Sequence, residues 1–428
     1  MLTLSAPRRV AIVGGNRIPF ARSNTHYAEA SNQEMLTAAL QGLVDRFNLH
    51  GQRLGEVAAG AVLKLSRDIA LTRESVLGTT LSPATPAYDV SQACGTGLEA
   101  AILVANKIAL GQIEVGIAGG VDTTSDAPIG LNEGFRKALL AANRARTTGA
   151  RLKALMGAGL TAPFRPEPPR NAEPRTGLSM GEHCEQMARR WNISREDQDA
   201  LAVESHRKAA AAWEAGLFDD LVTPFRGLGR DNNLRPDTDP ARLAAMKPVF
   251  DRESGTLTAA NSTPLTDGAS VVLLASEDWA RAHDLPVLAY LRLGETAAVD
   301  FVGGDEGLLM APAYAVPAML QKLGLTLQDF DFYEIHEAFA AQVLCTLKAW
   351  EDEDFARTRL GLQAAPGSID RDKLNVNGGS LAAGHPFAAT GGRILASLAS
   401  IINREGAGRG LISICAAGGQ GVVAVVEK

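Results

Sequence analysis

Two cysteines and two histidines stand in short motifs that could carry chemistry. The motifs are ACGTG, HEAFA, GHPFAATGG and CAAGGQG, which contain Cys94, His336, His385 and Cys415 respectively. A thiolate is a strong nucleophile, and imidazole accepts and returns protons near neutral pH. One such residue alone is more often structural than reactive. Two thiols and two imidazoles at predicted strand ends or helix starts together favour an active site.

The segment around Cys94 must position its sulfur. We predict an extended stretch at 88–90, a turn, and then a helix whose apolar residues recur every three or four positions until Gly111. Cys94 at the start of this helix would feel the positive end of the macrodipole, which favours the thiolate. Gly95 and Gly97 would leave room for another group, such as a thioester, beside the sulfur.

Length and composition restrict the class of protein. A chain of 428 residues with 46% hydrophobic residues is expected to form two or three domains. A net charge of −6 and a pI near 5.7 argue against a general nucleic-acid binder. No apolar run approaches membrane-spanning length, and residues 10–13 suggest a first strand rather than a signal peptide. Four scattered cysteines without zinc spacing suit a reducing cytoplasm and predict no metal site.

Strands and helices alternate through the first 122 residues. The predicted strands are 9–14, 57–62, 88–90 and 115–121, and the predicted helices are 32–47, 68–78 and 98–109. The strands are continuous apolar runs, which is typical of strands buried on both faces. We therefore predict an α/β fold with a mostly parallel, helix-covered sheet.

The same pattern begins again near residue 286. The predicted strands are 286–293, 331–335, 374–377, 411–415 and 421–426, and the predicted helices are 314–323, one that begins at His336, and 387–403. Each half has a turn bearing Cys94 or His385, then a helix, then a strand before a glycine pair. We interpret this as an internal repeat whose halves pack together, which would bring Cys94 and His385 within reach of each other.

Residues 123–256 interrupt the repeat and are predicted to form an inserted, mainly helical domain. Between 131 and 165, seven Lys and Arg residues accompany one acid, Glu133, with leucines between them, so part of this segment is a basic amphipathic helix. Three further helices are predicted between Met180 and Leu217. The basic excess could meet ligand phosphates or an anionic membrane surface. A solvated face or an oligomer contact would explain it equally.

The motifs, together with SMGEHCEQMARRWNISREDQDALAVESHRKA, GTLTAANSTPLTDGAS and NVNGGSLAAGHPFAATGG, resemble the thiolase family along essentially the whole chain. The resemblance implies a five-layered αβαβα core made of two similar halves, residues 1–122 plus 257–277 and residues 278–428. Residues 123–256 would be the loop domain that binds coenzyme A (CoA) or makes oligomer and partner contacts.

The resemblance also implies a role for each residue of the motifs. Cys94 would be the nucleophile that forms a thioester, and His385 would accept its proton and help to bind an oxyanion. Cys415 would exchange a proton with the α-carbon of acetyl-CoA. Backbone N–H groups of Cys94 and Ala417 would form a second oxyanion hole. Met180 and Thr263 match positions that line the CoA channel.

Three positions depart from the family's common pattern. Many thiolases have asparagine where this chain has His336, which could donate one hydrogen bond and could also titrate. HEAFA with GGSLAAGHP and CAAGGQG resembles the thiolase subunit of the trifunctional fatty-acid oxidation complex and its bacterial relatives. Ala417 replaces a common glycine, which a backbone donor tolerates unless φ is positive. Ser179 stands where some thiolases have a histidine that orients acyl-CoA, and is a candidate substrate contact.

The resemblance implies a fatty-acid β-oxidation enzyme, an acyl-CoA:acetyl-CoA C-acyltransferase that cleaves 3-ketoacyl-CoA with CoA or condenses two acetyl-CoA molecules. No tightly bound cofactor is expected. A homodimer or homotetramer, an enoyl-CoA hydratase/3-hydroxyacyl-CoA dehydrogenase partner and peripheral membrane contact are expected associations, and nucleic acid is not. The alternatives are a decarboxylating ketoacyl synthase, which would not need Cys415, and a CoA-binding scaffold without catalysis.

Overall fold

The computed structural model describes residues 7–157, 159 and 165–428. The main strands are β1 (Val10–Arg17), β3 (Glu56–Ala59), β4 (Ala87–Asp89), β5 (Val115–Asp122), β8 (Thr266–Ser276), β9 (Ala289–Ala298), β10 (Phe332–Ile335), β11 (Arg409–Ala416) and β12 (Gln420–Glu427). They form one mixed sheet in the order β10-β11-β12-β9-β1-β8-β5-β3-β4, and β2 (Ala21–Arg22) pairs with β8. The β1–β9 pairing joins the two halves of the sheet.

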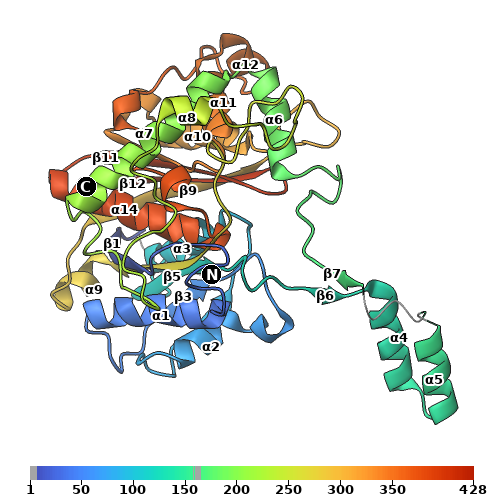
Figure 1. Cartoon of the computed structure of the whole chain (residues 1–428). Coiled ribbons are helices and arrows are strands. Elements are labelled where there is room, and N and C mark those ends of the chain that lie inside the picture. Colours follow the sequence, from blue (N-terminus) through green and yellow to red (C-terminus); the bar gives the residue numbers. More distant parts are fainter. Residues whose placement is uncertain (1–6, 158, 160–164) are drawn as a thin grey trace.

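Three layers of helices alternate with the two halves of this sheet, which gives five layers in all (Figure 1). The outer face of the first half is covered by α1 (Asn32–Arg46) and α2 (Leu71–Leu77). The outer face of the second half is covered by α10 (Ala311–Leu323) and α11 (Ala340–Glu351). The central layer consists of α3 (Thr96–Ala109) and α14 (Thr390–Glu405), whose apolar residues share one core with both half-sheets. The predicted five-layer α/β arrangement is confirmed.

The central helices approach closely because each carries glycine at the contact. A Cβ atom on Gly97 would lie 2.5 Å from the Ala388 carbonyl oxygen, and one on Gly391 would lie 2.2 Å from the Leu98 nitrogen. Gly95 likewise faces a Val422 methyl group at 2.5 Å. The space beside Cys94 that we predicted for a thioester is therefore occupied, at Gly95 and Gly97, by the second half of the chain itself.

The sheet is mixed, and the prediction of a mostly parallel sheet is wrong. β3 runs parallel to β4 and β5, and β10 runs parallel to β11, but β8 is antiparallel to β1 and β5. β12 is antiparallel to both β11 and β9. Strands with helices on both sides are apolar throughout in either direction, so the apolar runs alone did not report strand direction.

Three other predicted elements differ from the structure. Residues 374–377 are not a strand, since only a single bridge between Leu374 and Tyr333 forms there. α11 begins at Ala340 rather than at His336, because Phe339 has an extended backbone (φ −143°). Residues 180–217 contain two helices instead of three, α6 (Met180–Arg190) and α7 (Arg195–Glu214). α7 is continuous because it has no Gly or Pro and ends in an alanine-rich stretch.

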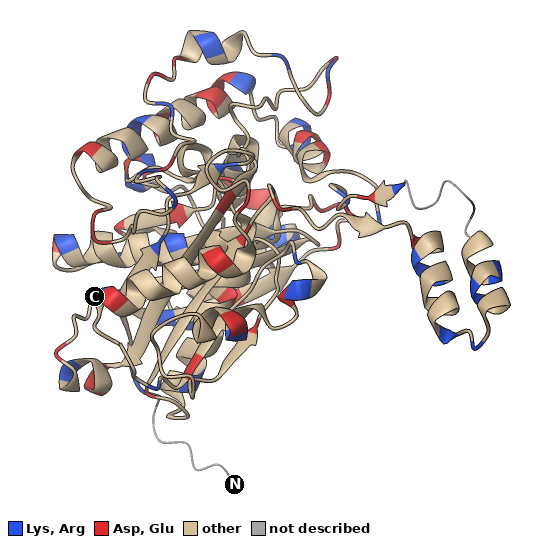
Figure 2. Cartoon of the chain, turned by 60° about the horizontal axis from the view of Figure 1, so that its bottom comes forward, with Lys and Arg blue, Asp and Glu red and all other residues tan. Residues whose placement is uncertain are grey.

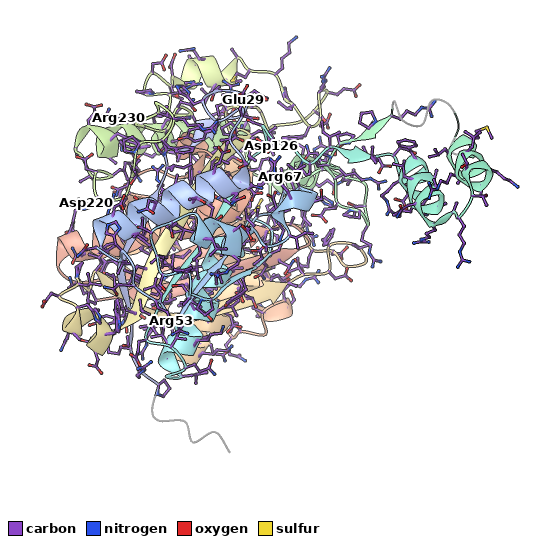
Figure 3. All side chains as sticks on the ribbon, turned by 90° about the horizontal axis from the view of Figure 1, so that it is seen from below. Glu29, Arg53, Arg67, Asp126, Asp220 and Arg230 are labelled. Atoms are coloured by element: carbon purple, nitrogen blue, oxygen red, sulfur yellow. The ribbon has the colours of Figure 1, made fainter. Side chains whose placement is uncertain are left out.

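The inserted segment has two parts. α4 (Glu133–Arg144) and α5 (Thr148–Met156) form a helical hairpin that projects from the body on a stalk of β6 (Gly130–Leu131) and β7 (Pro166–Glu167) (Figure 1). α6 and α7 pack on α11, and α7 also contacts α8 (Pro240–Ala244) and α13 (Ser380–Ala383). Arg67 and Asp126 form an ion pair where the stalk leaves the body (Figure 3). No helix in the described residues is long and apolar enough to cross a membrane.

Candidate active site

Cys94 lies in the turn between β4 and α3, where the first half meets the second. The turn is tight: Ala93 has a positive φ of 47°, and Gly95 N–H donates to the Gln92 carbonyl at 3.0 Å. Cys94 therefore sits two residues before the first residue of α3, and 9% of its surface is exposed. The predicted extended segment, turn and helix are all present.

His385 comes from the second half, in the turn between α13 and α14. Its Nε2 lies 3.1 Å from Cys94 Sγ, and its Nδ1 lies 2.6 Å from Thr390 Oγ1. An imidazole that accepts the thiol proton at Nε2 carries its own proton on Nδ1 and donates it to the threonine. Ala388 N–H, three residues further on, donates to buried Asp122 of β5 at 2.9 Å, which holds this turn against the first half. The predicted proximity of Cys94 and His385 is confirmed.

Both members of this pair are neutral at rest. Burial, with a smaller contribution from the Asp122 carboxylate, raises the pKa of the Cys94 thiol to about 12. Burial and the charge of Arg393 lower the pKa of His385 to about 3. The expectation that the helix end stabilises a thiolate is therefore wrong, because the cost of desolvating the anion exceeds the macrodipole's effect.

Cys415 is the second-last residue of β11, and Ala417 directly follows the strand. Backbone N–H groups of Ala417 and of Cys94 itself donate toward Cys94 Sγ, so they point at the reacting sulfur. Ala417 lies outside the left-handed region, which the next residues occupy instead (Gly418, φ 77°; Gly419, φ 71°), so alanine is tolerated here. The Cys415 thiol is 1% exposed, and burial together with the nearby Cys94 raises its pKa well above the ordinary value.

His336 completes the cluster from the loop between β10 and α11. Its ring centroid lies 4.1 Å from that of His385, with the rings tilted by 50°. Its Nδ1 lies 2.9 Å from Ser380 Oγ, and its Nε2 is buried without a hydrogen-bond partner among the described residues. Burial, then the neighbouring His385 and Arg393, lower the pKa of His336 well below the ordinary value. His336 is thus a neutral imidazole with one free nitrogen.

The three predicted substrate contacts lie at α6 and in the loop before β8. Ser179 caps α6, since its hydroxyl accepts from Glu182 N–H and donates to the Glu182 carboxylate at 2.7 Å. Met180, the next residue, is half-buried against the core that also contains Cys415. Thr263 donates to the Ala338 carbonyl through its hydroxyl at 3.1 Å. The cap accounts for Ser179 without a substrate contact.

The sequence reasoning missed two polar residues that hold the cluster in place. Thr390 orients His385, and its position five residues beyond the histidine in GHPFAATGG was the available signal. Glu173 accepts a hydrogen bond from Gly418 N–H at 2.9 Å, next to the Ala417 donor. No local pattern marked Glu173, because it lies 245 residues away from Gly418 in the chain.

A cavity near the cluster was also missed. Its volume is about 420 Å³, and it is lined by three arginines and two aspartates, with residues of the GTLTAANSTPLTDGAS motif on one wall. The arginines are Arg22, Arg235 and Arg242. Ser262 and Pro264, on either side of Thr263, also line it. The arginines are scattered through the sequence, so only the fold brings them together.

The fold is that of a thiolase. The family model described as "Thiolase, N-terminal domain" matches residues 10–278, and "Thiolase, C-terminal domain" matches residues 285–428. The chain therefore belongs to the thiolase family and is an acyltransferase.

Individual relatives agree with this assignment. The chain is 44% identical to a 3-ketoacyl-CoA thiolase of Photorhabdus laumondii, over 98% of this chain and 97% of that protein. It is also 44% identical to a 3-ketoacyl-CoA thiolase of Serratia proteamaculans, with the same coverage. The structure of human mitochondrial 3-ketoacyl-CoA thiolase superposes with a TM-score of 0.82 at 27% identity, covering 99% of this chain and 100% of that one. The same human enzyme in complex with CoA superposes with a TM-score of 0.81 at 27% identity, covering 98% of each chain.

Proposed function

We propose that this chain is a 3-ketoacyl-CoA thiolase, which cleaves 3-ketoacyl-CoA with CoA into acetyl-CoA and a shortened acyl-CoA. The observation that carries this proposal is the 3.1 Å contact between Cys94 Sγ and His385 Nε2, with the Ala417 N–H directed at the same sulfur. The relatives named above as 3-ketoacyl-CoA thiolases support it. The same site would run the reverse condensation of two acetyl-CoA molecules.

In the first half-reaction, Cys94 gives its proton to His385 Nε2 and its sulfur attacks the 3-keto carbon. The resulting oxyanion would accept hydrogen bonds from the N–H groups of Cys94 and Ala417, each worth about 3 kcal/mol. When the C2–C3 bond breaks, its electron pair leaves as the enolate of acetyl-CoA. The Cys415 thiol protonates C2, and acetyl-CoA departs from an acyl-Cys94 thioester.

The second half-reaction returns the enzyme to its resting state. The incoming CoA thiol gives its proton to the Cys415 thiolate and attacks the thioester carbonyl. Collapse of the tetrahedral intermediate forms the shortened acyl-CoA and expels the Cys94 thiolate, which recovers its proton from His385. A burst of acylation and ping-pong kinetics follow from the covalent intermediate.

Two substitutions test these roles. Cys94→Ser should abolish the acylation burst, and a normal burst would overturn the assignment of the nucleophile. Cys415→Ser should stop exchange of the α-protons of acetyl-CoA with deuterated water while acylation of Cys94 stays detectable. Unchanged exchange would remove Cys415 from the mechanism. A decarboxylating ketoacyl synthase makes its carbanion by losing CO₂ and would not catalyse this exchange even as the wild type, so the same assay separates the two functions.

We propose that the arginine-lined cavity holds the nucleotide part of CoA. Arg22, Arg235 and Arg242 offer cationic donors to its phosphates, and the wall at Ser262 leads toward Thr263, where the pantetheine arm would enter with Met180 nearby. Arg235→Ala should raise KM for CoA about tenfold with little change in kcat. Arg230→Ala is the control, since this exposed arginine pairs with Glu214 and does not line the cavity (Figure 3). An equal effect of both variants would place CoA elsewhere.

We propose that the α4–α5 hairpin docks on an anionic membrane surface. Both helices carry Lys and Arg residues at several positions along their length, as Figure 2 shows. Glu133, the acid within α4, pairs with Arg136 and Lys137. Large apolar side chains are exposed beside these charges: Leu152 is 57% exposed and Met156 is 62% exposed. Exposed apolar and cationic groups on one helical hairpin fit lipid acyl chains and anionic headgroups together.

Co-sedimentation with phosphatidylcholine vesicles, with and without phosphatidylglycerol, tests the docking. Binding should require phosphatidylglycerol, weaken with salt, and fall in a Leu152→Ser/Met156→Ser variant. Ile69→Ser is the control, since Ile69 is 86% exposed but lies on the body. Absence of binding at low salt would overturn the proposal. Capture of the hydratase/dehydrogenase by the hairpin without lipid would do the same and would assign the surface to that partner.

We also propose a cytoplasmic homodimer or homotetramer that works with a hydratase/dehydrogenase subunit. β4 supports self-association, because it ends the sheet with an open edge where a second copy could pair. Light scattering that shows a monomer at micromolar concentration would contradict this.

We propose that residues 1–122 plus 257–277, residues 123–256 and residues 278–428 form three separate domains. Hydrogen exchange should then show three opening units, and a single cooperative unit would contradict the division.

A further inference from the structure

Arg393 is a buried arginine with an unusual set of partners. It lies on α14 three residues after Thr390, and its side chain is 5% exposed. Its Nη2 donates to Ser380 Oγ at 2.7 Å, while the Glu334 carboxylate is 3.9 Å from Nη1, and Nε has no hydrogen-bond partner within the described part of the chain. A buried guanidinium without a close carboxylate is costly, so structural stabilisation alone does not account for it.

Arg17 shows how the same fold pairs a structural arginine. Its side chain is also 5% exposed, and it meets Asp231 through two hydrogen bonds of 2.6 and 2.8 Å. That pair satisfies two donors with one carboxylate in a fork geometry. Arg393, by contrast, directs its shortest hydrogen bond at a serine that touches the active site.

Ser380 connects Arg393 to His336. A guanidinium only donates, so Ser380 Oγ accepts from Arg393. In the described residues, the other partner of this hydroxyl is His336 Nδ1 at 2.9 Å, so the hydroxyl hydrogen has Nδ1 as its acceptor. The adjacent positive charge polarises the O–H bond and strengthens this donation. A neutral imidazole that accepts at Nδ1 carries its proton on Nε2.

His336 Nε2 is the nitrogen that the reaction needs. It is buried without a hydrogen-bond partner in the described residues, and its ring centroid lies 4.1 Å from that of His385, which contacts Cys94. We propose that Arg393 is a positioning residue: through Ser380 it holds His336 in the Nε2–H tautomer, as a donor to the enolate oxygen of acetyl-CoA. This inference rests on the proposed thiolytic function.

The charged and titratable surroundings agree with this assignment. Arg393 and His385 are the groups that, after burial, lower the pKa of His336, and Arg393 does the same to His385. The acids on the neighbouring elements include Glu334, opposite Arg393, and Glu337, which is held by Ser205, Asn375 and Leu381 N–H. Asp122 also lies against the His385 turn, where it accepts from Ala388 N–H. None of these acids has a hydrogen bond to either imidazole among the described contacts, so burial, together with the nearby cation, favours the neutral state of both rings.

The test measures tautomer and catalysis separately. In protein labelled with ¹⁵N-histidine, His336 of the unliganded wild type should show the Nε2–H tautomer at pH 7. Arg393→Met and Ser380→Ala should mix the tautomers and slow acetyl-CoA α-proton exchange about 10- to 100-fold, with KM changed less than threefold. Arg393→Lys should recover most of the exchange, since it restores the charge and a donor to Ser380.

Arg17→Met is the matched control, because it removes an equally buried arginine that does not contact Ser380. It should lower stability at least as much as Arg393→Met and leave tautomer and exchange as in the wild type. An unaltered His336 tautomer in Arg393→Met, or an equal loss of exchange in Arg17→Met, would overturn the inference. A wild type with the Nε2–H tautomer but no 3-ketoacyl-CoA cleavage would instead overturn the proposed function.

Discussion

The turn that carries Cys94 and the turn that carries His385 meet from opposite halves, but they are held differently. The Cys94 turn is closed by its own chain, through Gly95 N–H to Gln92 and Thr96 Oγ1 to Ala93 at 2.7 Å. The His385 turn is tied to the first half, since His385 N–H donates to Thr266 Oγ1 at 3.2 Å and Ala388 N–H donates to Asp122. The nucleophile's turn is therefore closed mainly by local hydrogen bonds, with one side-chain bond from Gln92 to Gln420 of the second half at 3.3 Å, whereas the base is placed by assembly of the halves.

The largest effect should come from breaking the pair between the turns. His385→Ala removes the proton acceptor from a thiol that is neutral at rest, so kcat/KM for 3-ketoacyl-CoA cleavage should fall about 10²- to 10⁴-fold. His283→Ala is the control, because that exposed ring stacks on Trp279 far from the site, and its activity should stay within about twofold of the wild type. More than a tenth of wild-type activity in His385→Ala would show that Cys94 does not depend on this base.

The next effect tests whether assembly of the halves positions the base. Gly391→Ala places a Cβ atom 2.2 Å from Leu98 nitrogen and pushes α14 away from α3. We expect a loss of about 1–3 kcal/mol in the free energy of unfolding, with slower thiolysis. Gly149→Ala, in α5 with nothing within 4 Å of its Cβ position, should be neutral or stabilising. Equal stability of the two variants in urea unfolding would contradict this close contact.

A pH effect distinguishes the two turns further. The pKa of His385 is about 3 in the folded protein against an ordinary 6.5, so the unfolded chain binds more protons between these values. The free energy of unfolding should therefore decrease as pH falls below about 6.5. His385→Gln should remove up to about 2 kcal/mol of the decrease between pH 7 and pH 5. Identical decreases in both proteins, measured by urea unfolding, would mean that His385 is accessible to protons when folded.

The smallest effect concerns the group that orients the base. Thr390→Val removes the acceptor for His385 Nδ1–H and leaves a buried donor unpaired, which should lower kcat about tenfold. Thr390→Ser keeps the hydroxyl and should restore at least half of the activity. Wild-type kcat in the valine variant would show that packing alone orients the imidazole.

Much of the site was predictable because its parts are local. Glycine-rich motifs around Cys94, His385 and Cys415 marked their turns, and the repeated order of strand, turn and helix predicted that two of these turns meet. The buried strands and the five layers followed from apolar patterns and from the family resemblance. The local patterns failed at strand direction and at the start of α11, where long-range pairing decides the outcome.

The sequence by itself indicated which residues are candidates for the reaction, because residue type and spacing within a turn are local properties of the chain. Tertiary structure alone decided the protonation of these residues, because burial outweighs the helix dipole and keeps Cys94 a thiol. It also supplied the supporting groups: Glu173 reaches the cluster from 245 residues away, and the contacts of Thr390 and Arg393 depend on how the segment 380–393 folds back on itself. Desolvation and hydrogen bonding depend on what surrounds a group in space, so the protonation and orientation of the cluster appear only once both halves are assembled.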